Sequence, residues 1–123
     1  MIRLDSTTRK LEVILAGAKT TVDAKVTVSY YDVPAQTKND FSEYRGVTQV
    51  ATTNGANDVT ICNAPTGNAV RNVDTIQVHN ADSANITATV MMDDGGTETP
   101  LVKQTLTTGQ TLMYEHGSGW KIL

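Results

Sequence analysis

The sequence lacks the features that mark secreted disulfide-rich proteins and membrane proteins. It has 123 residues and one cysteine, Cys62, so no disulfide can form within the chain. A lone cysteine favours folding in a reducing cytosol, and we interpret Cys62 as a small buried side chain of a strand. Apolar runs such as residues 13–16 are far shorter than the roughly 20 residues that cross a bilayer. Residues 1–5 do not resemble a secretory signal, so we expect no export by that route and no membrane partner.

The sequence also lacks a cluster of lysine and arginine. The formal net charge is −3 and the sequence pI is about 5.2. Nucleic-acid phosphates need a concentrated positive face, which this composition does not supply. We therefore expect no nucleic-acid partner.

Catalytic and metal-binding motifs are missing as well. The two histidines, His79 and His116, have no neighbours that complete a nucleophile or zinc pattern. Ser118 lies between two glycines but lacks the strand-turn-helix context of a nucleophile elbow. Asp93 and Asp94 precede two glycines, which is a routine turn signal, and the spacing does not fit a calcium-binding loop. We expect no enzyme, no cofactor and no metal.

What the sequence does contain favours strands. It has twenty threonines and many valines and asparagines, but only one Phe and one Trp. Threonine and valine lose side-chain freedom in a helix and suit a pleated sheet, while Asn and Gly form turns. This balance predicts an all-β fold.

Apolar and polar residues alternate along most of the chain, which is the period of a half-buried strand. The alternation predicts about eight or nine short strands and a single antiparallel β-sandwich over residues 1–123, jelly-roll-like in type. Strand order cannot be read from alternation, so an immunoglobulin-like sandwich stays open. The predicted strands span residues 10–15, 22–30, 47–51, 59–62, 73–79, 86–92, 101–106, 111–115 and 120–123.

Turn signals separate these segments. Asn54-Gly55 predicts a hairpin between the strands at 47–51 and 59–62, because both residues tolerate positive φ. A second hairpin is predicted between 73–79 and 86–92. Residues 1–8 are either an arm that adds a strand to a neighbouring subunit or the first strand of this domain.

The one long irregular stretch runs over residues 32–46. Four of the six aromatic residues lie in or beside it. Loops of this length commonly carry function, and Tyr and Phe anchor protein interfaces. We predict a protein interface at Tyr31, Phe41, Tyr44 and Arg45. The alternative is that Tyr30 and Phe41 complete the core while the loop caps one end of the sandwich.

Four segments, at residues 30–38, 59–65, 71–74 and 105–120, resemble small virion proteins of tailed bacteriophages. The resemblance runs over most of the chain, and its motifs have no catalytic content. Such families are typically β-sandwich or jelly-roll domains that serve as head decoration or cement proteins, or as tail and fibre components. The resemblance implies a virion location after synthesis in the cytoplasm of the bacterial host.

The expected function is therefore structural. We expect a capsid decoration protein that binds and bridges major capsid protein subunits, as a homo-oligomer and in first place a trimer. A tail, adaptor or fibre component is the alternative within the virion. A carbohydrate-binding module is the alternative of another class, with Tyr44, Tyr114 and Trp120 as stacking platforms.

Overall fold

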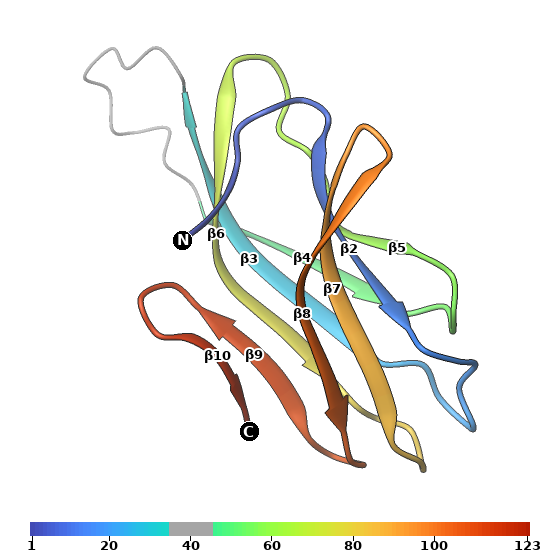
Figure 1. Cartoon of the computed structure of the whole chain (residues 1–123). Coiled ribbons are helices and arrows are strands. Elements are labelled where there is room, and N and C mark those ends of the chain that lie inside the picture. Colours follow the sequence, from blue (N-terminus) through green and yellow to red (C-terminus); the bar gives the residue numbers. More distant parts are fainter. Residues whose placement is uncertain (35–45) are drawn as a thin grey trace.

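The structure, a computed structural model of the chain, describes residues 1–34 and 46–123. These residues form ten strands, shown in Figure 1. No helix in the described part of the chain is long and apolar enough to cross a membrane. The strands are β1 (Ile2–Leu4), β2 (Arg9–Leu15), β3 (Lys25–Pro34), β4 (Gly46–Thr52), β5 (Val59–Cys62), β6 (Ala69–His79), β7 (Ile86–Asp94), β8 (Thr97–Leu106), β9 (Thr111–Glu115) and β10 (Gly119–Ile122).

The strands form two antiparallel sheets packed face to face (Figure 1). Sheet A has six strands in the order β10-β9-β6-β3-β4, with β1 also paired to β6. Sheet B has four strands in the order β5-β2-β7-β8. The pairs β2·β7 and β3·β6 are nested in the chain, one in each sheet. The predicted antiparallel β-sandwich is confirmed.

The core lies between the sheets and follows from the alternation. In β3, Val26 and Val28 are buried and lie opposite Val78 and Ile76 of β6. Leu11, Val13 and Leu15 of β2 form the matching inner face of sheet B. Removing each such side chain from water contributes about 1.5–3 kcal/mol, which is the main force that holds the sheets together. Cys62 is fully buried among them, as predicted.

Neither predicted hairpin is present. The Asn54-Gly55 turn connects β4 of sheet A to β5 of sheet B, so these strands do not pair with each other. Likewise β6 lies in sheet A and β7 in sheet B. Turn residues reverse the chain locally, but burial of both inner faces decides whether the next strand joins the same sheet or the opposite one. Hairpins do occur at β7–β8 and at β9–β10.

The ends of the predicted irregular stretch belong to strands. Asp32 to Pro34 continue β3, and Gly46 begins β4. Phe41, Tyr44 and Arg45 lie outside the described residues. At the N-terminus, Ile2–Leu4 pair with β6 of the same chain, which is the first-strand alternative for residues 1–8.

Candidate functional site

Two ends of the sandwich differ in the residues that close them. We call the end where β3 finishes at Pro34 and β6 begins at Ala69 the upper end, as drawn in Figure 1. The opposite end, formed by residues 16–24, 80–85 and 107–110, is the lower end. The predicted interface residue Tyr31 lies near the upper end, on β3 between Gly46 of β4 and Asn72 of β6, and is half-buried.

An arginine closes the upper end of the core. The Arg71 guanidinium lies 4.0 Å from the centre of the Tyr30 ring. Its Nε and Nη2 donate to the two carboxylate oxygens of Asp32 at 2.8 and 2.9 Å, and its Nη1 donates to the Asn63 carbonyl at 2.6 Å. Because Asp32 lies on β3 and Asn63 follows β5, this group joins sheet A to sheet B. We call these four residues the Arg71 cap.

The side chains of the Arg71 cap and the thiol beneath it are poor nucleophiles. The hydrogen bonds to Asp32 raise the pKa of Arg71 above its ordinary value, so the guanidinium stays charged. Cys62 lies beneath it, and burial raises the pKa of that thiol to about 11. A thiol with such a pKa is almost fully protonated at neutral pH and is a poor nucleophile. The cap therefore anchors the end of β3, where the chain enters residues 35–45.

Carboxylates gather on the outer face of sheet B. The carboxyl groups of Glu12, Asp58 and Glu98 lie within 4.8 Å of one another. Glu12 is buried. The Lys10 ammonium lies 2.8 Å from the Glu12 carboxylate and 3.6 Å from the Asp93 carboxylate. A hydrogen bond to Asp58 raises the pKa of Glu98. The cluster has the oxygen ligands that a hard cation prefers, but Lys10 already neutralises its one buried member.

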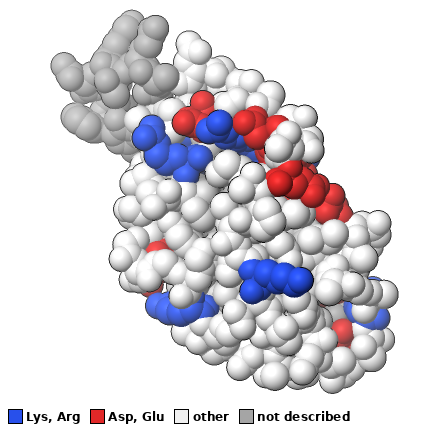
Figure 2. All heavy atoms as spheres, viewed as in Figure 1, with Lys and Arg blue, Asp and Glu red and all other residues white. Residues whose placement is uncertain are grey.

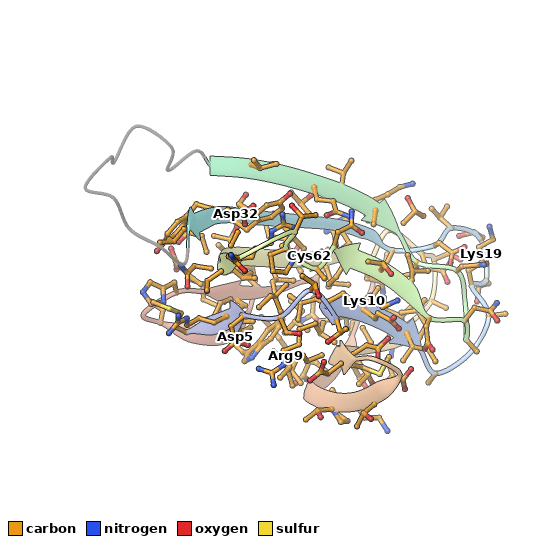
Figure 3. All side chains as sticks on the ribbon, turned by 90° about the horizontal axis from the view of Figure 1, so that it is seen from above. Asp5, Arg9, Lys10, Lys19, Asp32 and Cys62 are labelled. Atoms are coloured by element: carbon orange, nitrogen blue, oxygen red, sulfur yellow. The ribbon has the colours of Figure 1, made fainter. Side chains whose placement is uncertain are left out.

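The two acidic residues before the β7–β8 turn have structural partners. The Asp93 carboxylate accepts the Gly96 N–H at 2.7 Å, and Asp94 accepts from Thr8 and Arg9 at 2.6 and 3.0 Å. Arg9 also pairs with Asp5, so charges of both signs lie side by side near the upper end (Figures 2 and 3). These carboxylates are held by protein groups of the turn and of β2.

The histidines and Ser118 do not meet. His79 ends β6 and its Nδ1 lies 2.9 Å from the Thr111 hydroxyl. His116 and Ser118 lie in the exposed turn between β9 and β10, where the Ser118 N–H donates to the Glu115 carbonyl at 3.0 Å. Neither histidine makes a hydrogen bond to Ser118 within the described residues.

Two of the three aromatic residues suggested for carbohydrate stacking, Tyr114 and Trp120, pack against each other, and Tyr44 lies outside the described residues. Tyr114 is 5% exposed, and its hydroxyl accepts the Ile2 N–H at 3.1 Å. Trp120 is half-buried against it, with ring centres 5.2 Å apart and planes tilted by 52°. A ring that stacks on a sugar must present a free face, which Tyr114 does not.

Sequence reasoning missed the Arg71 cap and the carboxylate cluster. Arg71 and Asp32 are 39 residues apart, and the cluster brings together β2, the residue before β5, and β8. One signal was present: Arg71 shares its strand face with Val73, so a charge stands at an inward position of an apolar strand. Such a charge needs a buried partner.

Comparisons with known proteins add no relative. No protein-family model, curated protein or solved structure matches the chain.

Proposed function

We propose that this chain is a structural virion protein of a tailed bacteriophage, and in first place a capsid decoration protein. In this role the upper end of the sandwich binds major capsid protein subunits and bridges them. The contact residues are Tyr31, Phe41, Tyr44 and Arg45, and the protein acts as a homo-oligomer without catalysis or a cofactor.

One observation carries the proposal: the Arg71 cap anchors the strand that leads into the aromatic-rich residues 35–45. A binding segment loses less conformational entropy on docking when its ends are already held. At one end Pro34 pairs with Ala69, and at the other Gly46 pairs with Tyr31. Both strand ends therefore belong to the same well-paired sheet.

The remainder of the described surface and interior supports a binding role more than a chemical one. Every buried side-chain nitrogen and oxygen among the described residues has a hydrogen-bond partner. A group held for catalysis often lacks such a partner until substrate arrives. The resemblance to virion proteins supports the location, and the net charge of −3 limits adventitious binding to packaged DNA.

The copy number of this chain tests the proposal. Mass spectrometry of purified particles from the source phage measures the ratio of this chain to the major capsid protein. A ratio near the capsid stoichiometry supports decoration. A few copies per particle support a tail, adaptor or fibre component instead, and complete absence overturns the virion proposal and moves the carbohydrate-binding alternative to the front.

The interface is tested separately with Phe41→Ala/Tyr44→Ala. We expect loss of particle binding with an unchanged Tm, because truncating interface aromatics removes the energetic centre of a contact. Leu123→Ala is the matched control, since Leu123 is 62% exposed at the lower end. Binding that survives the double substitution places the contact elsewhere on the molecule.

A further inference from the structure

Each sheet of the sandwich ends in two edge strands. They are β4 and β10 in sheet A, and β5 and β8 in sheet B; the three-residue β1, off this order, pairs with β6 alone. An edge strand presents unpaired backbone N–H and C=O groups, which are a template for pairing with another chain. Natural proteins protect such edges with charges, prolines, bulges or very short strands.

Three of the four edges carry such protection. β8 contains Glu98, Pro100 and Lys103, and its register with β7 is broken by a bulge. β5 and β10 have four residues each. In β10, Lys121 adds a charge that pairs with Glu115 at 3.0 Å.

β4 has none of these protections. Its seven residues, Gly46–Thr52, include no charge and no proline. Its register with β3 is unbroken from Lys25↔Thr52 to Tyr31↔Gly46. Within residues 1–34 and 46–123, β3 is its only strand partner, and Figure 3 shows β4 along one border of the sandwich.

Two of the three apolar side chains of β4 are exposed, while Ala51 packs against the core. Val47 is 45% and Val50 is 74% exposed. Val50 and Thr48 lie opposite Thr27 and Ser29 of β3, on the face of sheet A that points away from the core. The strand is nevertheless held in place, because the Gln49 side chain accepts the backbone N–H of Asn63 at 3.2 Å.

We propose that β4 is a self-association strand, which pairs antiparallel with β4 of a second copy about a two-fold axis at Gln49 and so forms a dimer in place of the trimer expected from the sequence. This pairing sets Thr48 against Val50 of the other copy and Val47 against Ala51. Both are pairs of residues that suit neighbouring strands, and no like charges face each other. The two copies then share one continuous sheet through their sheets A.

The distribution of charge favours a second copy of this chain as the partner of β4, and it favours antiparallel pairing. Each copy has a net charge of −3, so two copies approach with least repulsion along an uncharged strand. β4 has no charge with which to select a foreign partner of opposite sign. Over the paired segment of β3, residues 25–31, the one charged side chain is Lys25, beside Thr52. Antiparallel pairing keeps the two Lys25 residues at opposite ends of the contact, whereas parallel pairing brings them together.

The oligomeric state tests the proposal without reference to any virion. Sedimentation equilibrium is measured from about 1 µM to about 500 µM, since a single strand edge is smaller than a standard interface and binds weakly. We expect a reversible dimer for the wild type and a monomer for Val50→Lys, which places a charge on the edge. Val22→Lys, at a residue 38% exposed in the lower loops, is the matched control and stays dimeric. A wild-type monomer over the whole range, a trimer, or a dimeric Val50→Lys overturns the proposal.

The register is tested by disulfide trapping with oxidised glutathione. In the proposed pairing, residue 48 of one copy faces residue 50 of the other with Cβ atoms about 5 Å apart, whereas two residues 50 are about 7 Å apart or more. A mixture of Thr48→Cys and Val50→Cys therefore forms the mixed disulfide faster than either variant forms its own. Cys62 does not compete because it is fully buried. Equal rates for all three disulfides overturn the register.

Discussion

The lower and upper ends of the sandwich are closed by different kinds of polar interaction. At the lower end, buried Asp82 accepts the backbone N–H groups of Thr20 and Thr21 at 2.7 Å each. Buried Asn80 donates to the carbonyls of Ala84 and Leu106 at 3.0 Å each. At the upper end, ion pairs between side chains accompany bonds to the backbone, as in the Arg71 cap and the ion pairs of Arg9 with Asp5 and Asp94.

The two ends therefore differ in how much they contribute to the stability of the fold. Side-chain to backbone bonds at the lower end fix loops that connect both sheets, and water has little access to the side chains of Asn80 and Asp82, which are 0% and 1% exposed. At the upper end Arg71 is buried, but its partner Asp32 is 38% exposed, so water compensates for part of the loss of that ion pair. The lower end therefore holds the fold, and the upper end tolerates change, as its proposed binding role requires.

Asn80→Ala has the largest expected effect. It leaves the carbonyls of Ala84 and Leu106 and the N–H of Asp82 without their partner inside the protein. We expect the free energy of unfolding to fall by about 3 kcal/mol or more, since each buried group left unsatisfied costs about 1–3 kcal/mol. Denaturant unfolding at unchanged m-value measures this. The control Asn57→Ala, in an exposed turn, stays within about 0.5 kcal/mol of wild type, and an equal loss in both contradicts the comparison.

Arg71→Met has a smaller effect at the upper end. The methionine keeps the apolar stem over Tyr30 but removes the bonds to Asp32 and Asn63. We expect a loss of about 1–2 kcal/mol, because Asp32 regains water. Arg71→Lys is the matched variant and recovers only part of it, since an ammonium cannot make the two-pronged contact. Full recovery by lysine shows that charge alone matters at this position.

The pH dependence of stability separates the two kinds of carboxylate. Hydrogen bonds lower the pKa of Asp82, through the N–H of Thr20 foremost, so its stabilisation is complete above about pH 4 and is lost as the pH falls further. The pKa of Glu98 is raised by Asp58, so its contribution is present at low pH and is lost as the pH rises through that raised value. Tm measured from pH 2 to pH 8 is expected to rise less steeply at acid pH in Asp82→Asn. In Glu98→Gln, the fall in Tm that the wild type shows as the pH rises through the raised pKa of Glu98 is expected to disappear. Variant curves parallel to the wild-type curve contradict both assignments.

The smallest expected effect is on the rate of thiol labelling at Cys62, which reports local opening of the upper end. Burial raises the thiol pKa to about 11, so we expect a disulfide reagent to label the native protein slowly and the unfolded protein at once. Arg71→Met should accelerate labelling more than its loss of global stability explains, because the cap lies over Cys62. Asn80→Ala should accelerate it only as far as global unfolding does. The reverse order of the two variants contradicts the division between the ends.

The sequence by itself determined the strands and the fold class. Period-2 alternation sends side chains to opposite faces within one strand, so Leu11, Val13 and Leu15 were identifiable as core residues without any knowledge of their partners. The nine predicted strands are all present, and β1 is the tenth. Burial of Cys62 followed from the same local pattern.

The tertiary structure alone decided which strands pair and which polar groups meet. The turn at Asn54-Gly55 was visible in the sequence, but its two strands went to different sheets because each sheet must bury its inner face against the other. The Arg71 cap and the cluster of Glu12, Asp58 and Glu98 arise from strands far apart in the chain. The unprotected edge of β4 likewise exists only once the sheet order is set, because a strand is an edge by virtue of its neighbours and not by its own residues.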